Sequence, residues 1–331
     1  MRPLPVLCAA LIGLALAGCG GSGGGAQPGG SRPARSGVAG ATLVLDFTPN
    51  AVHTGIYEAM ARHDDVRAGV RLHIVVPSAS TDSIRLLDTG RANFALLDIH
   101  DLAIARERGQ DIRGIMALVQ RPLAAVIAVP SVTDPRQLEG RTAGVTGLPS
   151  DTAVLRSVVA GAGGAPGAVH TITIGFNAVA DLVARRVAAA TAFWNDEGVT
   201  VRRRAPGFHV FRVDQFGAPA YPELILCATG ASLRSHAGVA RAVVRALTAG
   251  YEQVLADPAA GLRALTSQVP GLDAGLQAAE LRALLPAFRE PGGRVGTLSA
   301  DRLSAWADWE RKFGIVSRRP DVGAMFDLSL R

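Results

Sequence analysis

The 331-residue chain has little of what most metal and catalytic sites require. It contains no His-x-x-His or Cys-x-x-Cys pair, so no zinc site is indicated. Residues 145–152 lack the Gly-x-Ser-x-Gly pattern of a hydrolase nucleophile elbow. Lys312 is the only lysine, so only one side chain could form a Schiff base with a cofactor such as pyridoxal phosphate. The sequence therefore predicts no metal ion, no cofactor and no enzymatic activity.

The scarcity of lysine also changes how the charge is interpreted. A net charge of +6 and a pI near 10 would ordinarily suggest a nucleic-acid partner. Here the positive charge is almost entirely arginine, and the arginines are scattered apart from Arg202-Arg203-Arg204 and Arg318-Arg319. We therefore expect no binding to nucleic acid.

The first 40 residues do not have the composition of a folded domain. Residues 1–18 begin with Met1 and Arg2, continue through an apolar run too short to span a bilayer, and end in small residues, which predicts an export signal. Residues 19–40 are rich in glycine, serine and proline and predict a flexible tether.

Cysteine is rare, and its positions are informative. Leu16-Ala17-Gly18-Cys19 resembles the lipobox of bacterial lipoproteins, in which cleavage precedes a cysteine that then receives lipid. An ordinary secretory signal is the alternative. Cys8 leaves with the signal and Cys19 is the expected lipidation site, so Cys227 has no partner for an intrachain disulfide. We expect an extracytoplasmic protein that is anchored to the membrane by lipidated Cys19.

The remaining chain is long and apolar enough for two lobes, with 48% hydrophobic residues overall. Short apolar runs alternate with helical segments, which favours an α/β fold built on parallel sheets. The expected strands are 42–47, 71–76, 93–97, 112–119, 123–129, 142–146, 169–174, 188–194, 208–213 and 223–229; the expected helices are 50–62, 81–89, 98–108, 151–160 and 177–186, followed by a helical region at 232–313. Breaks at Val129-Pro130 and Tyr221-Pro222 suggest lobe 1 at 41–129 and 222–331 and lobe 2 at 130–221.

Two segments of 13 residues repeat the same order of helix end, turn and strand. LLDTGRANFALLD (86–98) aligns without gaps with LVARRVAAATAFW (182–194), which places Asp98 and Trp194 at equivalent strand exits. Because ligands of open α/β sheets bind beyond the carboxyl ends of strands, we expect both residues to face a shared cleft. Trp194 would stack on a ligand ring and Asp98 would accept hydrogen bonds.

Polar groups also gather in LDFTPNAVHTGIY (45–57), where a strand pattern changes to a helix pattern. Asn50 is a plausible helix cap, which needs no function. His53 and Tyr57 are four residues apart and share one helix face, so they either face a ligand or pack in the core. A second turn, 146–151, places Ser150 to cap a helix beginning near Asp151, and we expect it to line the cleft.

LDFTPNAVHTGIY resembles the LDWTPNxxHTGxY motif of the thiamine-pyrimidine precursor-binding proteins, solute receptors of bacterial ABC importers that are related to sulfonate receptors and to yeast pyrimidine synthase. GRANFAL (90–96), QLEGRTAGV (137–145) and LSADRLSAWADWERKFGIV (298–316) extend the resemblance over most of residues 41–330. The resemblance implies a type II periplasmic-binding-protein fold with two lobes, a hinge and an interlobe cleft. Phe47 stands where the family has a tryptophan that contributes an aromatic wall.

The implied function is an ABC importer's receptor for a thiamine-related aminopyrimidine, with the permease and ATPase as partners and a monomeric state. Riboflavin, sulfonate or nitrate are alternative ligands, and a pyrimidine-making enzyme is an alternative class. The carboxylates among the candidates favour an amino-bearing ligand. We expect ligand contacts from Asp46, Phe47, Asn50, His53, Tyr57, Asp98, His100, Gln120, Thr146, Ser150, Trp194, Asn195, Glu197 and Tyr221.

Overall fold

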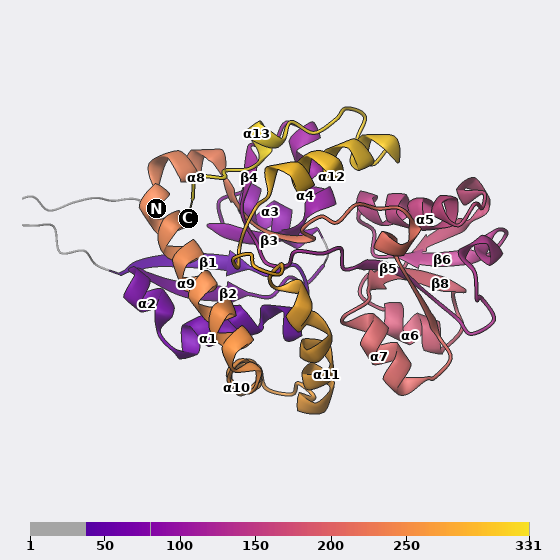
Figure 1. Cartoon of the computed structure of the whole chain (residues 1–331), viewed down its shortest axis with the longest axis horizontal. Coiled ribbons are helices and arrows are strands. Elements are labelled where there is room, and N and C mark those ends of the chain that lie inside the picture. The colour runs from indigo at the N-terminus through magenta and orange to yellow at the C-terminus, as the bar shows by residue number, and fades with distance from the viewer. Residues whose placement is uncertain (1–37, 80, 331) are drawn as a thin grey trace, which may run out of the picture. The chain divides into compact units, whose positions relative to one another are not determined.

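Two mixed β-sheets form the framework of the chain, each covered by helices (Figure 1). The structure is a computed structural model that describes residues 38–79 and 81–330. The predicted signal peptide, the predicted lipidation site Cys19 and nearly all of the predicted tether lie outside these residues. The compact unit begins at Gly37.

The first sheet has the strand order β2-β1-β3-β10-β4. Strand β1 pairs in parallel with β2 and β3, whereas β10 runs antiparallel to both β3 and β4. Its five strands are β1 (Ala39–Val44), β2 (Val70–Val75), β3 (Phe94–Asp98), β4 (Ile112–Ala117) and β10 (Leu224–Thr229).

The second sheet has the order β7-β6-β8-β5-β9. Strand β6 pairs in parallel with β7 and β8, and β5 runs antiparallel to β8 and β9. Its strands are β5 (Ala124–Ala128), β6 (Thr142–Val145), β7 (His170–Thr173), β8 (Ala189–Phe193) and β9 (His209–Arg212).

The prediction of parallel sheets is therefore wrong for one strand of each sheet. β5 and β10 are the first strands after the chain passes from one sheet to the other. Each enters its new sheet from the opposite end, so it runs against its neighbours.

The chain passes between the sheets at residues 118–123 and again at 213–223. The second crossing includes the predicted position near Tyr221-Pro222. The first occurs earlier than the predicted Val129-Pro130, because β5 already pairs in the second sheet. Pro130 marks the end of β5 and not the change of sheet.

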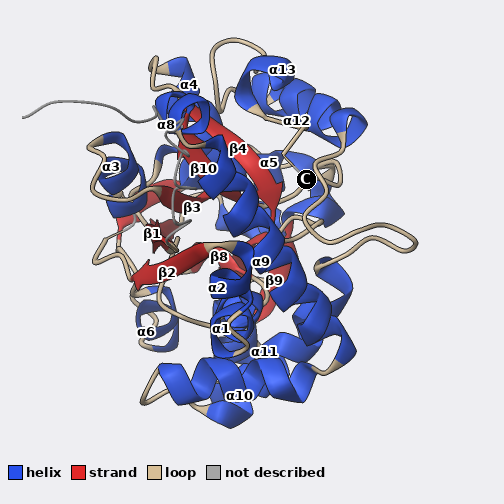
Figure 2. Cartoon of the chain, turned by 90° about the vertical axis from the view of Figure 1, so that its left-hand side faces the viewer, coloured by secondary structure: helices blue, strands red, loops and turns tan. Residues whose placement is uncertain are grey.

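Helices follow most strands and dominate the last third of the chain (Figure 2). No helix in the described part of the chain is long and apolar enough to cross a membrane. Their bounds are α1 (Thr54–Ala61), α2 (Asp64–Ala68), α3 (Asp82–Asp88), α4 (Ile99–Glu107), α5 (Pro149–Gly161), α6 (Ala178–Val183), α7 (Glu197–Arg204), α8 (Gly230–Ser235), α9 (Ala237–Ala256), α10 (Pro258–Gln268), α11 (Ala274–Leu284), α12 (Ala300–Lys312) and α13 (Val322–Met325), with short 3₁₀ turns η1 (Ala51–His53), η2 (Pro135–Leu138), η3 (Pro166–Ala168), η4 (Val213–Phe216) and η5 (Leu285–Ala287).

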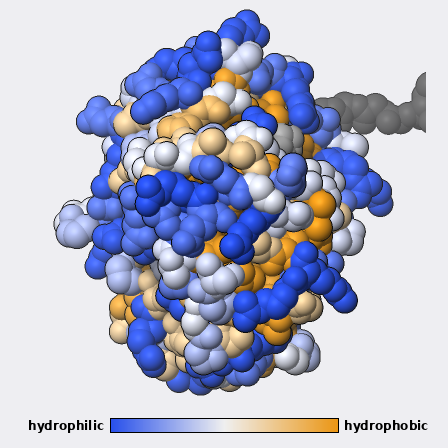
Figure 3. Space-filling model, turned by 90° about the vertical axis from the view of Figure 1, so that its right-hand side faces the viewer, coloured by the Kyte–Doolittle hydropathy of each residue, from blue (hydrophilic) through white to orange (hydrophobic). Residues whose placement is uncertain are grey.

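The apolar core follows the inner strands of the two sheets, whereas every residue of edge strand β7 is exposed. Every residue of β5 is buried, as is every residue of β3 except Asp98. The face over the second sheet is mostly hydrophilic, and its apolar patches are interrupted by charged side chains (Figure 3). Asp98, the last residue of the otherwise buried strand β3, lies next to the space between the sheets.

Candidate ligand-binding site

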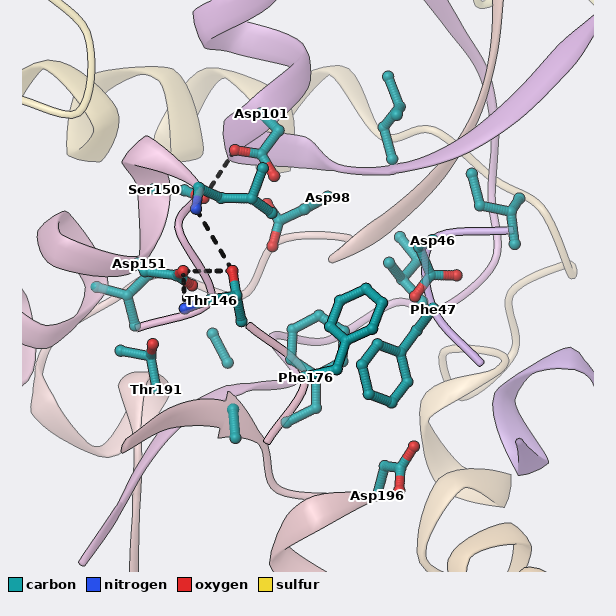
Figure 4. A pocket seen from close by; sticks show the side chains of 18 of the residues that line it. Asp46, Phe47, Asp98, Asp101, Thr146, Ser150, Asp151, Phe176, Thr191 and Asp196 are labelled. Atoms are coloured by element: carbon teal, nitrogen blue, oxygen red, sulfur yellow. Dashed lines mark hydrogen bonds between the residues drawn. The ribbon is translucent and has the colours of Figure 1, made fainter. Parts of the chain in front are cut away.

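A cavity lies between the two sheets, at the ends of strands from both (Figure 4). The space, counted together with its open mouth, is about 880 Å³. Apolar residues of the strands contribute much of the wall. The predicted site residues that line it are Asp46, Phe47, Asn50, Asp98, Thr146, Ser150 and Glu197.

The segment after β1 is folded by its own side chains. Asn50 caps η1, since its side-chain oxygen accepts a hydrogen bond from the N–H of Val52 at 2.9 Å. Fully buried His53 accepts the N–H of Asn50 at Nδ1, over 3.1 Å. Its Nε2 must then carry the proton, which it donates to Asp46 Oδ1 at 2.9 Å. His53 therefore does not line the cavity; it fixes the carboxylate that does.

Two phenylalanines form an aromatic contact across the cavity. Phe47 follows β1 of the first sheet and Phe176 follows β7 of the second, and their rings meet edge to face with centroids 4.4 Å apart. Both are partly exposed, so a flat ligand could reach either ring. Sequence reasoning missed Phe176, although its place just after an expected strand was the same indication that identified Asp46.

The turn after β6 joins the two sheets at the other side of the cavity. Asp151 accepts hydrogen bonds from the N–H and the hydroxyl of Thr146, at 2.7 and 2.6 Å. The Ser150 hydroxyl donates to Asp101 Oδ1 at 2.7 Å, linking α5 to α4 (Figure 4). The prediction that Ser150 caps its helix is wrong, because α5 already begins at Pro149 and its preceding residue makes no side-chain cap.

Carboxyl groups supply all the ionisable side chains of the cavity wall. Among residues 38–79 and 81–330, those lining the cavity include no lysine, arginine or histidine, but they include Asp46, Asp98, Asp101, Asp151, Asp196 and Glu197. Those carboxyls of the wall that are ionised attract cations and hydrogen-bond donors and repel anions.

Burial raises the pKa of several of these carboxyls toward neutrality. Burial first, then Glu280 and Asp46, raise the pKa of Asp196 to about 8. Burial and Asp196 raise that of Glu197 to about 8, and burial raises that of Asp101 to about 7. At neutral pH the wall therefore holds exchangeable protons and can either donate or accept hydrogen bonds.

Comparison with known proteins identifies the family. The family model described as NMT1/THI5 like matches residues 50–261. The chain belongs to the NMT1/THI5-like family. It is 30% identical over 274 residues to the formylaminopyrimidine-binding protein of Halalkalibacterium halodurans, a match covering 81% of this chain and 83% of the relative.

Solved structures place this NMT1/THI5-like protein in the predicted fold class. The alkanesulfonate-binding protein SsuA of Xanthomonas axonopodis pv. citri, bound to MOPS, matches with a TM-score of 0.70 and 14% identity over 88% of this chain and 99% of that one. A Candida albicans gene product with the generic periplasmic binding protein fold matches with a TM-score of 0.68 and 15% identity, over 87% and 96%. The predicted α/β periplasmic-binding-protein fold is confirmed.

In this NMT1/THI5-like protein, Trp194 does not line the cavity, contrary to the prediction. Its Nε1 donates to the carbonyl of Pro122 at 2.8 Å, and the guanidinium of Arg212 lies 4.4 Å from the ring centroid. Phe193, one residue earlier, lines the cavity instead. Successive residues leave a strand on opposite faces, so the repeat located the strand exit but not the residue facing the ligand space.

Four other predicted contacts pack behind the wall. Tyr57 belongs to a small apolar cluster with Leu265, as the core alternative proposed. Gln120 donates to the carbonyl of Thr297 at 3.0 Å. Asn195 is buried, and none of its atoms lines the cavity. Tyr221 is fully buried, and its hydroxyl lies 3.0 Å from His100 Nε2.

His100 is the centre of a buried charge cluster next to Asp98. Its Nδ1 pairs with Glu310 and its Nε2 contacts Tyr221. Burial lowers the pKa of His100, but the charges of Glu310, Asp98 and Glu223 outweigh this and raise it to about 10. Asp98, His100 and Glu223 are close enough to hold a metal ion. A protonated imidazole has no lone pair for a metal, so we interpret the three as an ion-pair cluster.

Proposed function

We propose that this protein is the solute-binding receptor of an ABC importer and that its ligand is an amino-bearing heterocycle of the thiamine-pyrimidine class. The observation that carries the proposal is a cavity wall whose described residues include six carboxyl groups and no cationic side chain, next to two aromatic rings. Such a site suits a flat ring with amino groups: the rings stack and the carboxyls accept N–H donors. The named binding function of the 30%-identical relative agrees with this chemistry.

The same wall argues against the alternative ligands sulfonate and nitrate. An anion would lie among carboxyls with no arginine or lysine to neutralise it. The structural neighbour bound to MOPS therefore shares the fold of this chain. On our proposal, the two proteins bind ligands of different charge.

We propose a binding role and not an enzymatic one. The polar lining consists of carboxyl, amide and hydroxyl groups, and His53 is fully buried behind Asp46. Lys312, the only lysine, lies on α12, outside the cavity. A receptor should release its ligand chemically unchanged.

The experiment is mass spectrometry of what co-purifies with the protein. The protein is purified from its own host or from cells fed with pyrimidine precursors, denatured, and its small molecules are identified and quantified. We expect one unchanged amino-bearing heterocycle per protein. Recovery of a sulfonate, or of a converted product that accumulates with time, would refute the assignment.

Membrane attachment and transporter partners complete the proposal. The segment Leu16-Ala17-Gly18-Cys19 supports lipidation outside the compact unit that begins at Gly37. We expect Cys19→Ala to release the protein from membranes without changing its melting temperature, as measured by fractionation in a bacterium that processes lipoproteins. Normal signal cleavage with full membrane retention in this variant would contradict lipid anchoring.

A further inference from the structure

Glu223 joins the two segments that pass between the sheets. It lies in the second crossing and is fully buried. Its Oε2 accepts hydrogen bonds from the backbone N–H groups of Leu123 and Ala124 at 2.7 and 3.1 Å, at the end of the first crossing. Its own carbonyl accepts the N–H of Ile99, the first residue of α4, at 2.9 Å. One residue therefore links both crossings to the helix that begins after Asp98.

The other carboxylate oxygen of Glu223 points toward the cavity wall. Glu223 Oε1 has no hydrogen-bond partner among the described residues. The charged group beside it is His100, whose Nε2 is 3.7 Å away. One oxygen of Asp98, a ring nitrogen of His100 and one oxygen of Glu223 lie within 4.8 Å of one another. Asp98 lines the cavity, and Glu223 does not.

The charges of this cluster do not balance unless it holds a proton. His100 provides one positive charge, and Glu310 is already paired with it. Half-buried Asp98 and fully buried Glu223 would then be two carboxylates side by side, which is unfavourable. The groups facing them from neighbouring elements are Tyr221 in the second crossing, Asp101 on α4 and, beyond it, Asp151 on α5; none of these is a cation. Burial and the charge of Glu223 both raise the pKa of Asp98 well above its usual range.

We propose that Asp98 and Glu223 share one proton behind the cavity wall, and that a heterocyclic ligand bound as a cation, with an N–H that donates to Asp98, displaces this proton. Glu223 is then a positioning residue, because it sets the protonation of Asp98 without touching the ligand. The cationic ligand keeps its own hydrogens, the shared proton leaves to solvent, and the net charge of the occupied site is unchanged. The displacement step rests on the proposed function; the shared proton does not.

The decisive variant is Glu223→Gln. The amide oxygen can still accept from Leu123 and Ala124, while the amide N–H₂ donates to Asp98 and removes the need for a shared proton. We expect calorimetry in buffers of different ionisation enthalpy, with 4-amino-5-hydroxymethyl-2-methylpyrimidine as ligand, to show about one proton fewer released per ligand in the variant. The slope of log Kd against pH should also be more positive by about one in the variant than in wild type.

The matched control is Glu58→Gln on α1, a buried glutamate outside the cavity. It should release as many protons as wild type. Equal proton release in wild type and Glu223→Gln would overturn the displacement step.

A ligand-free measurement separates this inference from the proposed function. Carbon-13 NMR of the Asp98 carboxyl, assigned with Asp98→Asn, should show it protonated at pH 7 in wild type and ionised in Glu223→Gln. An ionised Asp98 in both proteins would refute the shared proton. If no pyrimidine binds wild type, the proposed function and the displacement step fail together, and the NMR result still decides whether the proton is shared.

Discussion

At the scale of single residues, the cavity combines two kinds of contact that a flat, amino-bearing ligand needs. Phe47 follows a strand of the first sheet and Phe176 follows a strand of the second. A ligand ring can therefore contact both side chains only when it lies between the two sheets. Asp46 is held by buried His53, which leaves its second oxygen free for the cavity. The rings therefore provide stacking, and a fixed carboxylate provides orientation.

Phe176→Leu should weaken binding of an aminopyrimidine about three- to tenfold, because a stacked aromatic contributes about 0.5–1.5 kcal/mol beyond its buried area. The control is Trp194→Leu, an aromatic that lies outside the cavity. It should lower the melting temperature by several degrees through lost core packing and leave the Kd of the folded protein unchanged. Calorimetric titration of both variants checks this; unchanged affinity in Phe176→Leu would contradict the stacking role.

Half of the predicted site residues line the cavity, and the misses share a physical origin. Polar or aromatic residues after strands identified Asp46, Phe47 and Asp98, because strand exits can be recognised from local pattern. Which of two adjacent residues faces the cavity, as with Phe193 and Trp194, depends on how the strand is rotated in its sheet. Tertiary packing determines that rotation, and the sequence of a short apolar run does not reveal it.

At the scale of elements, α1 and α9 pack closely through two glycines. A Cβ on Gly250 would lie 2.0 Å from the carbonyl oxygen of Gly55, and one on Gly55 would lie 2.3 Å from the ring of Tyr251. The helices can approach this closely only because both positions lack a side chain. Since α1 follows η1, this contact also sets the position of Asp46 and Asn50.

Gly250→Ala should therefore lower the free energy of unfolding by about 1–3 kcal/mol through overpacking. Gly238→Ala, on the same helix with open space around its Cα, should be neutral or stabilise by up to about 1 kcal/mol. Urea unfolding of the two variants measures the difference. Equal stability of the two would show that the helices can separate at no cost.

Elements were predicted from the sequence far better than their directions. The runs at Thr42 and Phe94 correspond to β1 and β3, since apolar periodicity is local. The reversal of β5 and β10 was not predictable in the same way. Strand direction depends on where the chain changes sheet. Apart from Pro122, residues 118–123 carry no sequence signal that distinguishes a change of sheet from an ordinary turn.

At the scale of the whole molecule, the buried carboxyls make stability depend on pH in an unusual direction. Asp196 and Glu197 have pKa values raised to about 8, and Asp101 and Glu280 to about 7. In the unfolded chain such groups titrate near pH 4. Between about pH 4.5 and 8 the folded state therefore binds more protons, and the free energy of unfolding falls as pH rises.

We expect the ligand-free protein to melt several degrees higher at pH 5.5 than at pH 8.5, as measured by calorimetry. His100 acts in the same direction, because its pKa is raised to about 10. Carboxyls with lowered pKa values, such as Asp82, also contribute to the free energy of unfolding. They lose this contribution only below the pH at which they titrate in the unfolded chain, so they do not change the stability between pH 5.5 and 8.5. Asp196→Asn should flatten the profile, and an unchanged slope in this variant would contradict the assignment.

The most direct test of the central claim, that an acidic and aromatic cavity binds an amino-bearing heterocycle, is a calorimetric titration of the wild-type protein with a matched set of ligands. The set is 4-amino-5-hydroxymethyl-2-methylpyrimidine, its formylamino precursor, riboflavin, taurine and nitrate. We predict one-to-one binding of a pyrimidine with micromolar or tighter affinity, about −8 kcal/mol or more favourable, and no binding of nitrate or taurine. Binding of nitrate or taurine without either pyrimidine would contradict the account.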